Sequence, residues 1–168
     1  LLKMEDNITT DHIMPSDSSL LPFRSNIPKL SEHCLTPVDP TFPERAKAEG
    51  GGFLLAGQNY GQGSSREHAP WALEVNDINV VIAENFARIF RQNMYNCGMF
   101  AIEMPKDVID YLFKTYAGKE VTISVDVDSA SIRIQSPEKS ETIPFAIGGF
   151  DKTLVKEGGW VGFVNKNY

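Results

Sequence analysis

The sequence lacks three features that would point to common classes of function: paired cysteines, an excess of basic residues and a long apolar run. Its 168 residues include only two cysteines, Cys34 and Cys97, with no Cys-x-x-Cys pair and no Cys/His pair at metal-binding spacing. The chain by itself therefore predicts neither a zinc site nor an iron–sulfur site. The two thiols are expected to be free and buried.

The charge balance restricts the partners and the compartment. Sixteen basic and 22 acidic residues give a formal charge of -6, which argues against general affinity for nucleic acid or anionic membranes. No apolar run reaches the roughly 18 residues needed to span a bilayer, and residues 1–6 lack the layout of a signal peptide. We expect one domain over residues 1–168, in the cytoplasm or, in a eukaryote, the mitochondrial matrix. Because the sequence starts without methionine, we expect a fragment or subunit of a larger enzyme.

The most informative segment is residues 57–68, where glycines lead into Ser64-Ser65-Arg66-Glu67-His68. A short buried strand is predicted for residues 50–56 and a helix for residues 65–76, so the glycine-rich loop joins a strand end to a helix start. Glycine allows close backbone approach, and the free amides and the dipole of a helix start favour negative charge. The loop therefore predicts a site for a carboxylate or an oxyanion at Ser64.

A simpler explanation is a helix N-cap, a role that Ser64 or Ser65 could fill. A cap leaves the second hydroxyl unexplained, and it leaves Arg66 at a helix start, where the dipole disfavours a cation. The glycine spacing matches neither the phosphate-binding loop nor the dinucleotide fingerprint. We therefore favour a ligand site.

The rest of the chain predicts an α/β domain. Six prolines between Pro15 and Pro43 predict a long irregular region up to Glu49, although Leu20 and Leu30 indicate that it packs onto the domain. Beyond the loop the patterns predict further strands and helices. The strands are 79–83, 99–104, an antiparallel hairpin of 119–126 with 131–135, and 142–145; the helices are 86–94, 105–116 and 151–157.

The loop Gly61–His68 resembles the signature of the aconitase and isopropylmalate dehydratase superfamily, and residues 6–15 and 80–93 agree with it. The resemblance implies a swivelling β/β/α domain with a mixed sheet. It also implies an absent half, either the remaining aconitase domains or a large subunit. That half would carry a [4Fe-4S] cluster whose ligands lie outside this chain. No residue here matches a metal ligand, so the chain is expected to be catalytically incomplete alone.

The resemblance also implies roles for individual residues. Ser64 matches the family's catalytic base, which removes a proton from the carbon next to a carboxylate of a citrate-type substrate. A serine is a weak base, and preorganised amides and a guanidinium must stabilise its alkoxide. Ser65 and Arg66 match positions that contact the substrate carboxylate, and Arg24 matches an arginine that grips a distal carboxylate through two parallel hydrogen bonds.

Other residues are expected to support the site or to be bystanders. Asp11 and His12 match the family's Thr-Asp-His position at the rim, and Gly61 and Gly63 shape the loop. Met14 stands where some mitochondrial relatives carry a serine, so that hydroxyl contact is lost. Four further side chains have plainer interpretations: His33 on the surface, His68 as a helix residue bonding the loop, and Arg88 and Arg91 solvated on a helix face.

The resemblance favours the carboxy-terminal domain of an aconitate hydratase, which interconverts citrate and isocitrate, tricarboxylates, through cis-aconitate. The alternative is the small subunit of a 3-isopropylmalate dehydratase or a homoaconitase. The physical discriminator is the side chain facing the distal substrate group, an arginine for a carboxylate or an apolar residue for an isopropyl group. Two further alternatives are an RNA-binding regulatory relative, which the negative charge disfavours, and an isolated anion-binding module.

Overall fold

The centre of the domain is a parallel sheet that is covered on both faces. The computed structural model describes residues 2–167, without the side chains of residues 2, 3 and 21. The strands run in the order β1 (Leu2–Lys3), β2 (Gly52–Ala56), β3 (Ile78–Ala83) and β4 (Phe100–Glu103). Successive side chains of β2 enter different cores, because Leu54 packs on one face of the sheet and Leu55 on the other. Near-continuous apolar strands are typical of parallel sheets buried on both faces.

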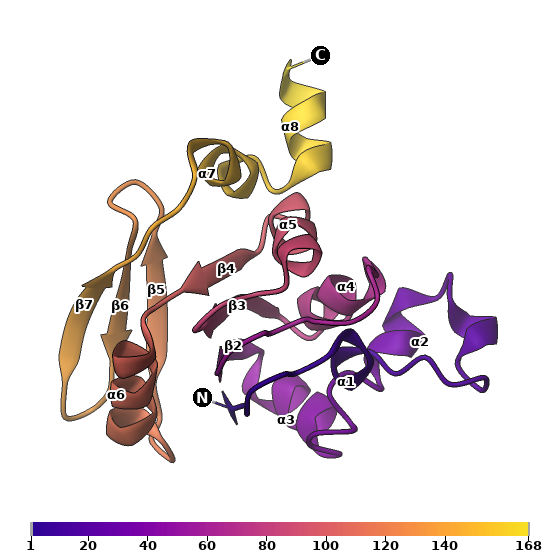
Figure 1. The fold of residues 1–168 in the computed structure, drawn as a ribbon, viewed down its shortest axis with the longest axis horizontal. Coiled ribbons are helices and arrows are strands. Elements are labelled where there is room, and N and C mark those ends of the chain that lie inside the picture. The colour runs from indigo at the N-terminus through magenta and orange to yellow at the C-terminus, as the bar shows by residue number, and fades with distance from the viewer. Residues whose placement is uncertain (1, 168) are drawn as a thin grey trace.

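Five helices lie towards one face of this sheet (Figure 1). They are α1 (Thr10–Ile13), α2 (Ile27–Ser31), α3 (Phe42–Glu49), α4 (His68–Val75) and α5 (Arg88–Asn96). Their apolar side chains, including the fully buried Leu73 and Met94, share a core with Leu54 and Ala56 of β2. These helices surround the loop that follows β2.

A second, antiparallel sheet covers the other face together with α6 (Lys106–Tyr116). Its strands are β5 (Thr122–Asp126), β6 (Ser131–Gln135) and β7 (Ser140–Pro144), in that order. Ile132 and Ile134 alternate with polar residues on β6 and pack into one core with Ile82, Ile102 and Leu112. The predicted α/β class is confirmed, and the parallel and antiparallel strands are divided between two sheets instead of forming one mixed sheet.

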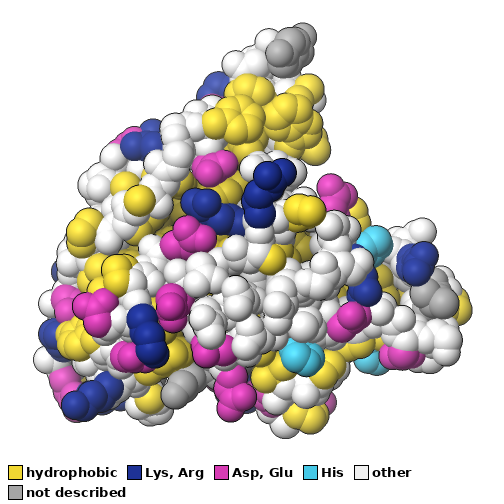
Figure 2. All heavy atoms as spheres, viewed as in Figure 1, with side chains coloured by type: hydrophobic (Ala, Val, Ile, Leu, Met, Phe, Trp, Pro, Cys, Tyr) yellow, Lys and Arg dark blue, Asp and Glu magenta, His cyan; other side chains and the backbone are white. Residues whose placement is uncertain are grey.

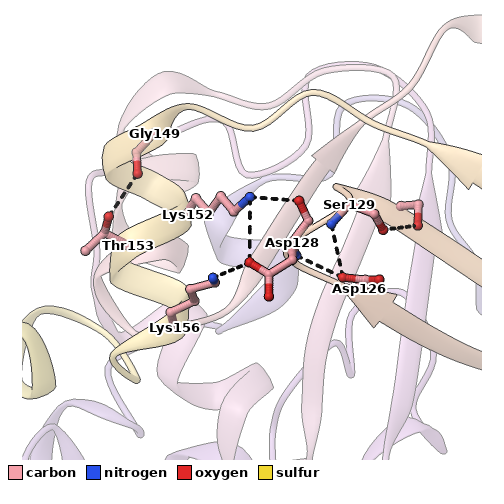
Figure 3. Close-up of polar contacts among 8 residues, drawn as sticks. Asp126, Asp128, Ser129, Gly149, Lys152, Thr153 and Lys156 are labelled. Atoms are coloured by element: carbon pink, nitrogen blue, oxygen red, sulfur yellow. Dashed lines mark hydrogen bonds and ion pairs between the residues drawn. The ribbon is translucent and has the colours of Figure 1, made fainter.

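The chain then returns across the domain through α7 (Gly149–Lys156), which is tied to the turn between β5 and β6 (Figure 3). Lys152 Nζ donates to the Asp128 carbonyl at 2.9 Å, and Lys156 forms an ion pair with the Asp128 carboxylate. The turn is braced by Asp126 Oδ1, which accepts the Asp128 amide at 2.9 Å and the Ser129 amide at 3.1 Å. These contacts join the antiparallel sheet to the C-terminal helices.

The last helix, α8 (Trp160–Asn167), was not expected from the sequence. None of its described residues is buried; instead Trp160 stacks on Phe163 at 5.6 Å, and both rings contact Phe150 of α7. Figure 2 shows hydrophobic side chains gathered at the top of the view, over α8, where Val161 is 71% exposed. No helix in the described part of the chain is long and apolar enough to cross a membrane.

The prediction of an irregular region up to Glu49 was wrong. That region contains α2, α3 and a short 3-10 turn at Leu21–Phe23. The prolines do not prevent these helices, because Pro28 and Pro43 occupy the first turn of α2 and α3, where a missing N–H leaves no hydrogen bond unmade. The expected packing is present, since Leu20 and Leu30 are buried.

Two helices also begin later than predicted. The helix expected from residue 65 starts at His68, with Glu67 as its N-cap. The helix expected from Phe86 starts at Arg88. Phe86 and Ala87 are extended because their amides donate to Glu103 at 3.3 Å and to the Tyr60 carbonyl at 2.9 Å.

Candidate active site

The glycine-rich loop leaves the carboxyl end of β2, beside the segment that leaves β3 and starts α5. Ligands of open parallel sheets bind outside the carboxyl ends of the strands. Hydrogen bonds connect the loop to both neighbouring segments: Thr10 N donates to Gln62 O at 2.8 Å, and Tyr60 N donates to Asn85 O at 3.1 Å. The three segments that carry the family resemblance therefore meet at one place in the fold.

Two glycines give the loop its path. Gly61 is buried with φ +79°, and a Cβ there would lie 2.2 Å from the Phe90 ring, so only glycine fits without rearrangement. Its amide donates to Ile8 O at 2.7 Å. Gly63 has φ +110°, a backbone conformation that other residues rarely adopt. The loop conformation therefore requires glycine at position 61 and favours it at position 63.

Beside the loop lies a hollow of about 600 Å3, which we call the larger hollow. Arg24, Ser64, Ser65 and Arg66 all line it, although Arg24 is 40 positions from Ser64 in the sequence. The lining also includes apolar side chains, namely Met14, Leu20, Leu30 and Ile89, and the polar side chains of Ser16, Glu67, His68 and Asn93. The four residues assigned to substrate or catalysis by resemblance therefore face one cavity.

The segment that carries Arg24 is fastened to α4. His68 Nε2 lies 3.2 Å from the Arg24 carbonyl oxygen, within hydrogen-bonding distance. The His68 ring also makes an edge contact with Trp71 at 5.2 Å. This placement agrees with His68 as a helix residue that bonds a loop.

Ser64 is exposed, and its hydroxyl has no hydrogen-bond partner within residues 2–167. The N-cap of α4 is Glu67, three residues later, so the prediction of a helix N-terminus directly at Ser64 was wrong. Neither serine caps the helix. The groups next to Ser64 are the loop's own amides and the side chains that share the hollow.

Asp11 holds the guanidinium of Arg66. Arg66 Nη1 donates to Asp11 Oδ1 at 2.7 Å, and Ser16 Oγ donates to the same oxygen at 2.7 Å. The hydrogen bond from Ser16, followed by that from Arg66, lowers the pKa of the Asp11 carboxyl. Ser16 lines the larger hollow and was not identified from the sequence.

His12 does not line either cavity described here. Its Nδ1 accepts the Thr9 amide at 3.1 Å, and its own amide donates to Thr9 Oγ1 at 3.1 Å, which together cap α1. His12 thus supports the site by fixing the helix that carries Asp11. Its predicted position at the rim of the site stays a prediction.

A pH titration can test the Asp11 contact. Because the folded-state pKa of Asp11 is depressed below the ordinary 3.8, its ion pair contributes above that value and is lost as pH falls through the lower folded pKa. We expect Ser16→Ala to raise the pKa of Asp11 towards 3.8, since the Ser16 hydrogen bond is the largest cause of the depression. NMR titration of the carboxyl carbon measures this. Ser18→Ala, an exposed neighbour, should change nothing, and equal titrations in both variants would contradict the assignment.

The described residues contain no group of three or more His, Cys, Asp or Glu side chains placed to hold a metal ion. Cys34 is fully buried and Cys97 half-buried. Burial raises the pKa of both thiols, that of Cys97 to about 11. With one thiol fully buried and neither thiol in a group of three potential ligands, the described residues do not fit an iron–sulfur cluster.

A second, smaller hollow of about 270 Å3 adjoins the first. It shares Ser64, Ser65 and Arg66 with the larger hollow and adds Arg88 from the start of α5. The sequence had suggested only a solvated role for Arg88 and Arg91. Arg88 is exposed but lines this hollow, and Arg91 is half-buried over the Tyr95 ring at 5.6 Å.

Proteins of known family are similar to this chain in sequence. Residues 40–107 match the model of the aconitase C-terminal domain. The chain is 36% identical to 3-isopropylmalate dehydratase small subunit 2 of Archaeoglobus fulgidus, over 98% of this chain and 92% of that protein. It is 38% identical to the 3-isopropylmalate dehydratase small subunit of Halothermothrix orenii, over 96% and 90%. The chain belongs to the aconitase family.

The fold agrees with this membership. The crystal structure of 3-isopropylmalate dehydratase from Methanocaldococcus jannaschii matches with a TM-score of 0.78 and 32% identity, covering 98% of this chain and 90% of that one. This chain is a hydro-lyase subunit of the family. These relatives are isopropylmalate dehydratase small subunits, whereas the resemblance had favoured an aconitate hydratase. The comparisons therefore support the alternative interpretation better than the aconitate hydratase.

Proposed function

We propose that this chain is the small subunit of a two-chain hydro-lyase of the 3-isopropylmalate dehydratase type and supplies its catalytic base. The observation that carries the proposal is the shared lining of Ser64, Ser65, Arg66 and Arg24 in one hollow. It occurs in a chain that matches small subunits of this name over almost its whole length. The large subunit is the partner.

The dehydration removes a proton from the carbon next to a carboxylate and a hydroxyl from the adjacent carbon. Ser64 Oγ first gives its own proton to water, and the resulting alkoxide takes the proton from the substrate carbon; its hydroxyl lies on the cavity lining with no hydrogen-bond partner in the described structure. Arg66, held by Asp11, binds the substrate carboxylate together with Ser65. Since the residues here do not fit an iron–sulfur cluster, the [4Fe-4S] group belongs to the large subunit, and this chain accounts for proton removal and carboxylate binding.

The apolar part of the lining supports a branched aliphatic substrate. Met14, Leu20, Leu30 and Ile89 form this part of the larger hollow. Ile89 is 49% exposed in the chain alone and would lose contact with water when substrate and partner cover the hollow. An isopropyl group can be buried against these side chains, whereas a third carboxylate needs a cationic partner.

One observation favours a second candidate, a hydro-lyase for a tricarboxylate such as citrate. Arg24 also lines the larger hollow, and a guanidinium can bind a distal carboxylate through two parallel hydrogen bonds. The two candidates therefore make opposite demands on one side chain.

Replacing Arg24 separates the candidates. In the complex with the cluster-bearing large subunit, we expect turnover of 3-isopropylmalate, and we expect Arg24→Leu to change its KM by less than about threefold, because no substrate charge faces Arg24. A tricarboxylate substrate would instead lose about 10- to 100-fold in kcat/KM, the range for a lost charge-assisted hydrogen bond, and Arg24→Lys would mainly raise KM. Steady-state kinetics with 3-isopropylmalate and isocitrate decide this. Turnover of isocitrate alone would refute the main candidate.

A further inference from the structure

The segment between α1 and α2, residues 15–26, forms one side of the larger hollow, and we call it the outer wall. Its residues Ser16, Leu20 and Arg24, spaced four apart, line the hollow. Leu20 is buried, whereas most residues between these three are exposed. In Figure 1 the segment lies at the edge of the domain. The outer wall therefore has the hollow on one side and solvent on the other.

Few polar contacts attach the outer wall to the rest of the domain. Backbone hydrogen bonds form the turns of the wall and the start of α2. In the described structure, two side-chain hydrogen bonds connect the wall to α1 and α4. One joins Ser16 to Asp11, and the other joins the Arg24 carbonyl oxygen to His68. The position of the wall therefore depends on these two contacts and on the burial of Leu20.

Both contacts fix the wall relative to Arg66. Asp11 Oδ1 accepts Ser16 Oγ at 2.7 Å and Arg66 Nη1 at 2.7 Å, so the first end of the wall shares an acceptor with this guanidinium. His68 follows Arg66 by two residues and holds the far end of the wall at Arg24. The group that binds the substrate carboxylate in our proposal is thus connected to both ends of the wall.

His68 holds the backbone of the wall and not the Arg24 side chain. Its Nε2 lies 3.2 Å from the Arg24 carbonyl oxygen. Because a carbonyl oxygen can only accept, Nε2 carries the proton and donates it. The imidazole is oriented by an edge contact with the Trp71 ring, one turn further along α4. His68 also lines the larger hollow, so this contact lies directly at the cavity.

We propose that His68 is a positioning residue for substrate specificity, which holds the outer wall at a fixed distance from Arg66. The inference rests on the proposed function. The reacting end of the substrate binds Arg66, and the distal group meets Leu20 and Arg24 of the wall. The separation between these two ends selects the bulk of the distal group, because a group of the wrong size loses contact with the wall or collides with it.

The test compares two amide variants in the complex with the large subunit. His68→Gln places an N–H donor at nearly the reach of Nε2, whereas the side chain in His68→Asn is too short for the Arg24 carbonyl. We expect His68→Asn to raise the KM for 3-isopropylmalate about 2- to 10-fold, the scale of one lost hydrogen bond, with kcat changed by less than about twofold. Its kcat/KM preference for 3-isopropylmalate over 3-methylmalate should fall by a similar factor. His68→Gln should keep both values close to those of the unmodified chain.

Hydrogen exchange in the same complex, without substrate, measures the attachment of the wall itself. The amides of Phe23 and Asn26 are bonded within the wall at 3.0 and 2.7 Å. They should exchange faster in His68→Asn than in His68→Gln or the unmodified chain, while the amides of β6 should exchange at the same rate in all three.

Three results would overturn the proposal. One is an unchanged KM and preference in His68→Asn, and another is an equal loss in both variants. The third is a raised KM with unaltered exchange, since His68 would then act on the substrate directly. If the unmodified complex turns over no 3-isopropylmalate while exchange is faster in His68→Asn, the proposed function fails and the attachment of the wall by His68 stands.

Discussion

Ser64→Ala in the complex with the large subunit is expected to lower kcat by about 10²- to 10⁴-fold, the range for a lost general base, while KM changes little. The physical reason is that the methyl side chain keeps the loop path and the amides of the hollow but cannot take a proton. Arg66 and Ser65, which bind the carboxylate in our proposal, remain in place. Steady-state kinetics give kcat and KM separately, and single-turnover mixing isolates the chemical step.

Ser124→Ala is the matched control for this prediction. Ser124 lies exposed on β5, in the antiparallel sheet, away from the lining of either hollow. Like Ser64→Ala, this variant removes one exposed serine hydroxyl, but it should leave kcat unaltered. A Ser64→Ala enzyme with near-normal turnover would remove Ser64 from the mechanism and leave its exposed hydroxyl without a role.

Gly61→Ala is expected to cause the largest loss of stability. The added methyl would lie 2.2 Å from the Phe90 ring, and alanine is strained at φ +79°. Backbone strain of this kind costs about 1–3 kcal/mol, and overpacking a filled core costs about 1–3 kcal/mol more. We expect a total of about 2–6 kcal/mol, measured as a lower midpoint in urea unfolding. The loop and α5 would also separate, so activity should fall with stability.

Gly118→Ala separates the two contributions. Gly118 has a similar φ of +70°, but a Cβ there would meet no atom within 4 Å. It therefore reports the backbone strain alone, and the difference between the variants reports the collision with Phe90. Equal losses for Gly61→Ala and Gly118→Ala would show that the close contact with Phe90 does not constrain the loop.

Regular periodicity made much of the fold predictable. Apolar and polar residues alternate in β5 and β6, and β2, β3 and β4 are apolar runs. Each of these patterns predicts one strand, because the burial of a strand is reflected in the order of its own residues. The helices before β2 could not be predicted from the sequence. Pro28 and Pro43 looked like helix breakers, yet each sits in a helix first turn, a distinction that depends on helix boundaries that the sequence does not mark.

Some residues of the candidate site could be identified from the sequence, and others could not. Ser64, Ser65 and Arg66 are adjacent in an unusual loop, so the sequence identified them together. Ser16 and Arg88 have no local signal, since a serine after a proline and an arginine on an amphipathic helix are ordinary surface residues. Only their placement, Ser16 on the Asp11 carboxylate and Arg88 on the smaller hollow, distinguishes them.

The sequence by itself determined the α/β class, the glycine-rich loop and the family, because these depend on residue type and spacing within short segments. Tertiary structure decided which residues meet. It brought Arg24 to the lining that holds Ser64, gave His12 a capping role, and put the start of α5 on the smaller hollow that Ser64 also lines. These contacts depend on how segments that are far apart in the chain pack around the parallel sheet. No single segment of the sequence encodes them.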